Sequence, residues 1–236
     1  MIEVVAETGS TNADLLARLR ANEAVKEGAW LLADRQTQGR GRGGRSWIGE
    51  EGNLFASTMV KLRTDDPPAQ TLSFVTSLAL HAVIDNLRTQ PFALQLKWPN
   101  DVLVAGAKLS GILLERARDA VVVGIGVNIR TAPALNDRKT TSLRAHGMEI
   151  ERDTLAQSLA ATFARELKHW RTSPPSATFD RWQAHAHPVG STLSVHDSNG
   201  SPRTGIYQGL SDEGALLLRL ADGTVAAITA GDVSLG

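Results

Sequence analysis

The segment that decides how this chain is interpreted is Gln36-Thr37-Gln38-Gly39-Arg40-Gly41-Arg42-Gly43-Gly44-Arg45-Ser46-Trp47. Its four glycines let the backbone approach a ligand closely, and its three arginines supply donors for phosphate or carboxylate groups. Strand-like apolar runs lie on either side, at Trp30 to Ala33 and Asn53 to Leu62. The pattern therefore predicts a ligand-binding loop between two strands of an α/β fold.

Three other interpretations of this loop fit less well. Gly39 to Ser46 matches the P-loop spacing with Arg45 in place of lysine, but a P-loop runs directly into a helix and here a strand follows. RGG-type RNA-binding tracts are usually repeated within basic, disordered sequence, and this tract is single. A solvated surface loop does not account for so many arginines. A mobile loop that orders over a phosphorylated substrate, with Trp47 available to stack on a ring, is the favoured interpretation.

Composition narrows the class of protein. The 236 residues are 42% hydrophobic and 21% charged, as in ordinary globular proteins. Equal numbers of basic and acidic residues, 25 each, disfavour a globally basic nucleic-acid binder. The absence of cysteine excludes disulfides, thiolate catalysis and cysteine-based zinc sites. Without a signal peptide or a membrane-length apolar run, we expect a cytoplasmic protein with no membrane segment.

The pattern along the chain predicts an α/β domain over residues 1–187 and a small all-β barrel over residues 188–236. Helical spacing is found at Ala13 to Leu19, Leu72 to Leu87, Asp153 to Trp170 and Thr178 to Ala186. Further strands are predicted at Ile2 to Ala6, Leu94 to Trp98, Asp101 to Val104, Leu109 to Glu115 and Ala120 to Ile129. The barrel is predicted from short runs at Thr192 to Val195, Gly205 to Gln208, Ala215 to Leu220 and Val225 to Thr229, separated by turns such as that at 197–200.

Three more segments are candidates for chemistry. Lys97-Trp98-Pro99-Asn100-Asp101 ends a strand-like run, where ligands often bind in α/β folds, although a simple Asx turn explains it too. Lys108 to Glu115 places a lysine at the start of an apolar strand, where it is either functional or only solvated. Gly124-Ile125-Gly126-Val127-Asn128 lacks the third glycine of a dinucleotide fingerprint, and is either a close approach to a ligand or a strand-end bulge. Serine-hydrolase and zinc-protease motifs are absent.

Taken in order, these segments resemble biotin protein ligase. The matching pieces are Ser10-Thr11-Asn12, Gln36 with Gly39 to Trp47, Lys97 to Asp101, Lys108-Leu109-Ser110-Gly111-Ile112-Leu113, and Gly124 to Asn128. The C-terminal stretch that ends Gly231-Asp232-Val233-Ser234-Leu235 resembles the SH3-like domain of that family. The resemblance implies a class II synthetase-like mixed sheet with helices, followed by an SH3-like β-barrel.

The resemblance also implies a reaction in two steps. The biotin carboxylate attacks the α-phosphate of ATP to give biotinyl-5′-AMP and pyrophosphate, and a lysine of a biotin carboxyl carrier protein then takes the acyl group. The expected partner is the carrier protein of acetyl-CoA carboxylase or of a related biotin-dependent carboxylase. Because a carboxylate meets a phosphate, fixed positive charge is needed. Mg²⁺ is expected to assist the triphosphate, with Asp101 as an indirect ligand.

Site residues carry over by position from the same resemblance. The catalytic candidates are Lys108, Arg42 and Arg40. The biotin-binding candidates are Ser10, Thr11, Asn12, Gln36, Gly39, Arg40, Gly41, Arg42, Lys108 and Gly111. The ATP-binding candidates are Arg40, Arg42, Arg45, Trp47, Lys97, Asn100, Lys108, Gly126 and Asn128. For Ser10 and Thr11, helix capping is an alternative role that is compatible with ligand binding.

Two departures from the family pattern bear on function. Gly43 stands where the family loop usually carries arginine. Ser10 to Asn12 falls at the start of the chain, so we expect a monofunctional ligase without a helix-turn-helix domain and without DNA binding, and a homodimer through a sheet edge is compatible with the pattern. The alternatives left open are a lipoate-type ligase of the same fold, a biotin-binding storage protein, and a non-enzymatic nucleic-acid-binding module that uses the Arg/Gly loop.

Overall fold

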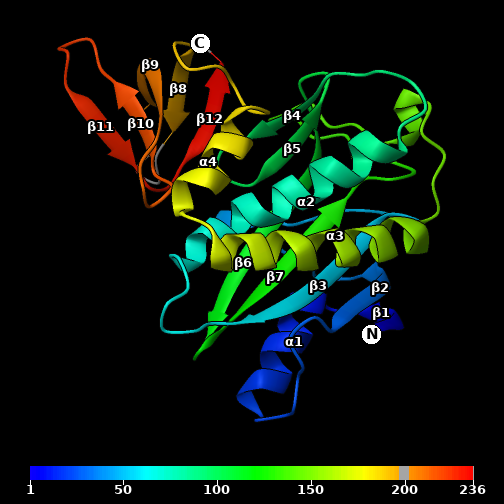
Figure 1. Ribbon diagram of the computed structural model, residues 1–236. Coiled ribbons are helices and arrows are strands. Elements are labelled where there is room, and N and C mark those ends of the chain that lie inside the picture. The colour runs from blue at the N-terminus through cyan, green and yellow to red at the C-terminus, as the bar shows by residue number, and fades with distance from the viewer. Residues whose placement is uncertain (197–201, 236) are drawn as a thin grey trace.

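A seven-stranded mixed sheet forms the centre of the molecule (Figure 1). The computed structural model of the chain describes residues 1–196 and 202–235. The strand order is β1-β2-β3-β7-β6-β5-β4, in which β1 and β2 are parallel and the other neighbours are antiparallel. The strands are β1 (Ile2–Thr8), β2 (Trp30–Gln36), β3 (Leu54–Lys61), β4 (Leu94–Lys97), β5 (Asp101–Val104), β6 (Ala107–Ala117) and β7 (Ala120–Val127).

Helices cover both faces of this sheet. They are α1 (Thr11–Arg20), α2 (Leu72–Leu87), α3 (Arg152–Thr172) and α4 (Pro175–Gln183), with short 3₁₀ turns at Arg42–Gly44, Ala69–Thr71 and Arg144–His146. Ser10 caps α1, since its side chain accepts a hydrogen bond from the Ala13 amide. Within the described residues, no helix is both long enough and apolar enough to cross a bilayer.

Alternation along the central strands divides the core into two layers. On one face, Val121 and Val123 of β7 join the large cluster that α2 and α3 cover. On the other face, Val122 packs with Leu15 and Leu16 of α1. Figure 1 shows α2 and α3 together on one side of the sheet and α1 on the opposite side.

The α1 face of the sheet has small side chains at its centre. Following the same alternation, this face carries Ser57 on β3, Gly111 on β6, and Gly124 and Gly126 on β7, and these residues pair in adjacent rows. Without large side chains, the sheet cannot fill the space beyond the N-terminus of α1. The same pattern that leaves this space also provides the floor of a cavity.

The second sheet is antiparallel and five-stranded, with the order β11-β10-β9-β8-β12. Its strands are β8 (Thr192–His196), β9 (Pro202–Leu210), β10 (Leu216–Arg219), β11 (Val225–Ile228) and β12 (Asp232–Leu235). It packs against the first domain. At this contact, Trp98 donates from Nε1 to the Gly214 carbonyl at 3.1 Å. Its buried apolar side chains belong to the same cluster as those under α2 and α3.

The predicted fold class is confirmed, and the elements follow the predicted order. The helix at Leu72–Leu87 has its predicted bounds, whereas the helix predicted at Thr178 to Ala186 begins at Pro175 and ends at Gln183. Strand β12 was missed, because four residues within a Gly- and Ser-containing terminus give too short a pattern. The turn predicted at 197–200 lies outside the described residues. The domain boundary at residue 187 stays a prediction.

Candidate active site

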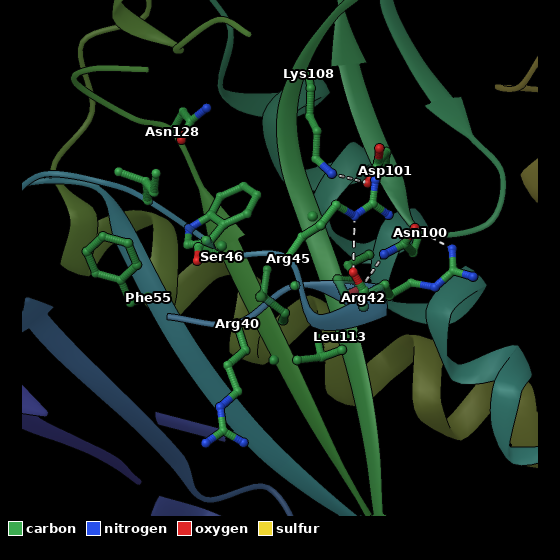
Figure 2. A pocket seen from close by; sticks show the side chains of 18 of the residues that line it. Arg40, Arg42, Arg45, Ser46, Phe55, Asn100, Asp101, Lys108, Leu113 and Asn128 are labelled. Atoms are coloured by element: carbon green, nitrogen blue, oxygen red, sulfur yellow. Dashed lines mark hydrogen bonds and ion pairs between the residues drawn. The ribbon is translucent and has the colours of Figure 1, made fainter. Parts of the chain in front are cut away.

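A cavity of about 310 Å³ opens between the N-terminus of α1, the Arg/Gly loop and strands β3, β5, β6 and β7. Figure 2 shows its wall, with Lys108 and Asp101 above the loop and Asn128 to one side. The sequence-predicted residues that line it are Ser10, Thr11, Asn12, Gln36, Arg40, Gly41, Arg42, Arg45, Trp47, Asn100, Asp101, Lys108, Gly111, Gly124, Gly126 and Asn128. Gly39 and Lys97 do not line it. Segments distant in the sequence therefore converge on one volume.

A neutral polar group, Ser10, Thr11, Asn12 and Gln36, forms one part of this wall. Gln36 Oε1 accepts from the Thr11 backbone N–H at 2.8 Å and lies 3.1 Å from the Thr11 hydroxyl. Ser10, Thr11 and Asn12 are each 3% exposed, so their polar atoms are withdrawn from bulk water but still reach the cavity. Such a group suits an uncharged ligand that has both donors and acceptors.

The Arg/Gly loop folds back on itself as a short hairpin over the cavity. The Trp47 amide donates to the Gly39 carbonyl at 2.9 Å, and the Gly41 amide donates to the Arg45 carbonyl at 2.7 Å. Gly39 therefore serves the base of the loop and does not line the cavity. Arg40 points its guanidinium away from Lys108 and Asp101 (Figure 2). These backbone bonds contribute to the shape of the loop.

Trp47 lies flat against the small residues of the sheet. A Cβ built on Gly126 would lie 2.2 Å from Cε2 of the Trp47 indole, so only glycine admits the ring. The Lys108 ammonium lies 5.8 Å from the centroid of the same ring. The indole Nε1 is buried and has no hydrogen-bond partner. An unpartnered buried donor is costly, and this one lies against Gly126 in a side chain that lines the cavity.

Lys108 and Asp101 form an ion pair in the wall. Lys108 Nζ lies 2.6 Å from Asp101 Oδ1, and the two side chains are only 16% and 12% exposed. The backbone of Lys108 is held by the segment opposite, since its amide donates to Lys139 O and its carbonyl accepts from the Thr141 amide, both at 2.9 Å. The ammonium is thus fixed in place and shielded from solvent, where its charge acts strongly.

Three arginines line the cavity together with Lys108, and these four side chains form its cationic group: Arg42, Arg45, Lys108 and Arg138. Arg42 Nη1 donates to Asn100 Oδ1 at 3.2 Å, while Asn100 Nδ2 donates to the Ile112 carbonyl at 2.5 Å. Asn100 therefore anchors the loop to strand β6. Burial lowers the pKa of the Arg42 guanidinium, and the charges of Asp232 and Asp101 oppose that shift.

Arg45 connects the loop to the second sheet. Its guanidinium makes a forked pair with the Asp232 carboxylate, at 2.6 and 3.1 Å. Burial alone would raise the pKa of Asp232, but the Arg45 hydrogen bond and the charges of Arg45, Arg138 and Arg42 outweigh it and leave that pKa below its usual value. Asp232 itself lines the cavity. The small domain thus supplies a charged side chain to the site.

Lys97 lies beside the cavity and not in its wall. It pairs in register with Asp101 across the β4–β5 hairpin. Burial lowers the pKa of its ammonium, the Asp101 charge opposes this shift, and the Lys108 charge adds to it. Its position allows an indirect effect on Asp101 only.

Several lining residues were missed from the sequence. They are Ser46, Ile48, Phe55, Ala56, Ile112, Leu113, Ile125, Pro133, Leu135, Asp137, Arg138, Thr140 and Asp232. Ile112, Leu113 and Ile125 lie inside the matching segments but were not named as site residues, and the other apolar members lie outside any motif. Phe55 and Leu113 follow from strand alternation once the face is known. Arg138 and Asp232 come from segments without a recognisable pattern, and their position depends on tertiary packing. The only sequence signal for Asp232 is its place at the start of the C-terminal stretch.

Sequence comparisons place the chain among known proteins. Residues 4–130 match the Biotin/lipoate A/B protein ligase family, and residues 195–236 match the Biotin protein ligase C terminal domain. The chain is 38% identical over 238 residues to the biotin–[acetyl-CoA-carboxylase] ligase of Mycobacterium tuberculosis, covering 98% of this chain and 88% of that one. It is 35% identical over 228 residues to the enzyme of that name from Paracoccus denitrificans, covering 92% and 93%.

Solved structures agree with these relatives. The biotin protein ligase from Aquifex aeolicus, in complex with biotin and ATP, matches with a TM-score of 0.84 and 28% identity over 100% of this chain and 98% of that one. The ligase from Leishmania major in complex with biotinyl-5-AMP matches with a TM-score of 0.69 and 25% identity, covering 97% of this chain and 98% of that one. The chain belongs to the biotin/lipoate protein ligase family, and its curated relatives place it among the biotin protein ligases.

Proposed function

We propose that the protein activates biotin as biotinyl-5′-AMP and transfers the biotinyl group to a lysine of a biotin carboxyl carrier protein of acetyl-CoA carboxylase. The observation that carries this proposal is the single cavity that joins the neutral polar group to the cationic group. Biotin has an uncharged ureido ring at one end and a carboxylate at the other, so both groups find a partner in one molecule.

The first step brings two anions together. A carboxylate oxygen attacks the α-phosphorus of ATP, the bond from that phosphorus to the bridging oxygen breaks, and pyrophosphate leaves. We assign Lys108 to the carboxylate and the α-phosphate, because its ammonium is fixed and largely buried. Arg42 and Arg45 are assigned to phosphate oxygens. When the carboxylate and the phosphate bind, the Lys108 ammonium would interact with them, and its ion pair with Asp101 would weaken.

In the second step, the uncharged amine of the acceptor lysine attacks the acyl carbon. The acyl–oxygen bond to AMP breaks, AMP leaves, and the nitrogen releases a proton. The intermediate is a mixed anhydride that water would destroy. The Arg/Gly loop and Trp47, which lie over the cavity, are suited to excluding that water.

The individual assignments follow from what each side chain offers. Ser10, Thr11 and Gln36 are assigned to the ureido ring, and Asn12 is assigned to the same site through Ser57, which bonds to both Asn12 and Thr11. Trp47, Asn128 and Gly126 are assigned to the nucleotide, since Asn128 Oδ1 and Trp47 Nε1 are both buried without a partner. Arg40 lines the cavity but directs its guanidinium away from Lys108, so we assign it to biotin through its backbone, and its catalytic and ATP-binding roles stay predictions.

Magnesium enters this proposal as a companion of ATP. Among the described residues, no three His, Cys, Asp or Glu side chains gather into a metal site. Asp101 and Asp232 line the cavity, but each is already paired with a basic side chain. This donor set fits an ion held mainly by phosphate oxygens and water, with a carboxylate in its outer sphere. The ion would reduce the charge of the triphosphate when bound.

Four expectations from the sequence stay predictions. They are the domain boundary at residue 187, a cytoplasmic location, no binding to DNA, and a homodimer formed through a sheet edge. The outer strands available for such a dimer are β1 and β4 in the large sheet.

Transfer to a carrier domain tests the proposal as a whole. Purified protein is incubated with biotin, ATP, Mg²⁺ and the carrier domain of acetyl-CoA carboxylase, and the carrier is analysed by intact mass spectrometry. We expect one biotinyl group at one lysine, and none on a carrier in which that lysine is replaced by arginine. Modification by lipoate in place of biotin, or no modification of a folded carrier, would contradict it.

A further inference from the structure

A chain of hydrogen bonds connects the neutral polar group to two residues that have no part in the reaction described above, Ser57 and Glu115. It runs from Thr11 to Ser57 on β3, back to Asn12 on α1, and ends at Glu115 on β6. The distances are 2.7 Å between the Thr11 and Ser57 hydroxyls, 2.6 Å from Ser57 Oγ to Asn12 Oδ1, and 2.9 Å from Asn12 Nδ2 to Glu115 Oε2. Ser57 is fully buried, so no water competes for its two bonds, whereas the bond from Asn12 to Glu115 is only partly buried.

The direction of each bond in this chain follows from its last member. A carboxylate only accepts hydrogen bonds, and so does the Leu113 carbonyl, which lies 3.5 Å from Asn12 Nδ2. Both acceptors fix the Asn12 amide with its nitrogen toward β6 and its oxygen toward Ser57. Ser57 must then donate its one proton to Asn12 Oδ1.

The Thr11 hydroxyl is the next group in this chain, and Thr11 lines the cavity. With its proton used, Ser57 offers only lone pairs to Thr11, so the Thr11 hydroxyl donates to Ser57. The other acceptor near that hydroxyl, Gln36 Oε1, is farther away at 3.1 Å and already accepts from the Thr11 N–H at 2.8 Å. Thr11 Oγ1 is therefore left with lone pairs only, and because Thr11 lines the cavity it is available as an acceptor for a ligand.

Ser10 and Gln36, the neighbours of Thr11 in the cavity wall, are left as hydrogen-bond donors. Ser10 Oγ accepts the Ala13 N–H at 3.5 Å as the cap of α1, which leaves its own proton free to donate. Gln36 uses Oε1 on Thr11, which leaves its Nε2 donor. The wall thus offers one acceptor beside donors. A cyclic urea, with an N–H next to a carbonyl oxygen, is the complementary pattern.

Gly124 makes the chain of bonds geometrically possible. Asn12 crosses the sheet from Ser57 to Glu115 directly over this residue, and a Cβ there would lie 2.3 Å from Asn12 Oδ1. Ser57 and Leu113 are the register partners of Gly124 on either side. The absence of a side chain at this position lets one amide connect β3 to β6 across β7.

We propose that Glu115 is a positioning residue for biotin: through Asn12 and Ser57 it fixes the Thr11 hydroxyl as a hydrogen-bond acceptor for the ureido N–H. The proposal rests on the assignment of Thr11 to the ureido ring under the proposed function. Glu115 touches no substrate, and its effect is on recognition of the ring, not on the adenylation chemistry. Loss of its carboxylate is expected to weaken the binding of biotin and to leave the binding of ATP unchanged.

Steady-state pyrophosphate exchange, with KM for biotin, KM for ATP and kcat determined separately, tests this proposal. Glu115→Gln keeps the shape but can donate as well as accept, so Asn12 is no longer held in one orientation. We expect KM for biotin to rise about tenfold, with kcat and KM for ATP within about twofold of the wild type. Ser57→Ala, which interrupts the chain one step later, should give a similar rise. The double variant should add little, because both changes disable one chain of bonds.

Two further variants separate the possible failures. Glu213→Gln, the same exchange on an exposed turn of the second sheet, should leave all three constants unchanged. Thr11→Val should raise KM for biotin. If it does so while Glu115→Gln has no effect, the positioning role is wrong and the biotin site stands. If neither variant changes KM for biotin, the assignment of Thr11 is wrong and the proposal falls with it. A parallel fall in all constants and in Tm for Glu115→Gln would show a structural role only and would also overturn it.

Discussion

At the scale of single residues, Lys108 carries the largest expected effect. Its ammonium is held by Asp101 in a wall that excludes most solvent, so no water or neighbouring side chain replaces its charge. We predict that Lys108→Ala lowers kcat for adenylate formation at least about a hundredfold, the size of effect that follows loss of a fixed transition-state donor. Biotin-dependent pyrophosphate exchange measures this directly.

The matched control is Lys139→Ala. Lys139 is exposed, contacts Lys108 through its backbone carbonyl only, and does not line the cavity. Its exchange rate should stay near the wild-type value. An active Lys108→Ala enzyme would remove Lys108 from the catalytic role, and an unfolded one would be recognised by circular dichroism.

Which residues reach the cavity was predictable where a motif contained them. Asn100 and Asp101 were singled out because they end a strand-like run, where ligands often bind in such folds, and Lys108 was assigned from the resemblance to biotin protein ligase. Lys97 was included for the same reason but lies beside the wall, since its register with Asp101 leaves it behind that residue. The direction of a side chain within a short hairpin is not encoded in the local pattern.

At the scale of elements, the Arg/Gly loop depends on its contact with β7. A methyl group at Gly126 would overlap the Trp47 indole, at 2.2 Å from Cε2, so the ring must leave the sheet. We predict that Gly126→Ala lowers kcat/KM for ATP in the exchange reaction at least about tenfold, equivalent to about 1.4 kcal/mol. Gly9→Ala, where a Cβ meets no atom within 4 Å, should have no such effect. Equal rates for the two variants would contradict the proposed contact of Trp47 with the nucleotide.

Helix α2 contains a buried histidine that makes stability depend on pH. His81 is 6% exposed and stacks on His185 with ring centroids 4.0 Å apart. Burial, followed by the charge of His185, lowers the pKa of His81 to about 4. Because the unfolded chain has the ordinary histidine pKa of about 6.5, the unfolded state binds more protons between these values. The free energy of unfolding should therefore fall as pH drops from 6.5 toward 4.

Thermal unfolding at pH 7 and pH 5 measures this effect. We expect Tm to fall by several degrees between them, and the fall to be smaller in His81→Gln, which does not titrate. His187, whose pKa is also lowered by burial and by Lys97, contributes in the same direction and accounts for part of what remains. An equal fall in both proteins would show that His81 is not a cause.

Elements with long periodic patterns were predictable, and short ones were not. The 16 residues of α2 gave its bounds from the apolar spacing alone. The four-residue strand β12 gave no signal, because its pairing with β8 depends on a segment more than 30 residues away in sequence. The residues of β7 that face the cavity could not be identified from the hydrophobic pattern of the sequence, because both faces of this strand are covered by helices and its pattern is apolar throughout.

At the scale of the whole molecule, Arg45 and Asp232 join the two domains across the cavity. Both side chains are partly exposed, at 39% and 53%, so the pair should contribute under about 1 kcal/mol to stability. Its larger effect is on the loop, because it fixes the arginine that follows the loop's glycines. We predict that Asp232→Asn speeds tryptic cleavage after Arg45 several-fold with Tm nearly unchanged.

The control for this prediction is Asp212→Asn, at an exposed turn of the same domain. Cleavage products are mapped by mass spectrometry, so that cuts elsewhere are not counted. An unchanged cleavage rate after Arg45 in Asp232→Asn would show that the loop is ordered by its own backbone bonds alone. The second domain would then have no effect on the conformation of the loop.

The central claim is that one cavity holds biotin and ATP together and forms an acyl-adenylate. Pyrophosphate exchange into ATP, with purified protein and Mg²⁺, tests it most directly, with biotin and lipoate in parallel reactions. We predict exchange that depends on biotin and not on lipoate. Exchange with lipoate alone would place the protein elsewhere in its family. No exchange with either acid, from folded protein, would contradict the claim.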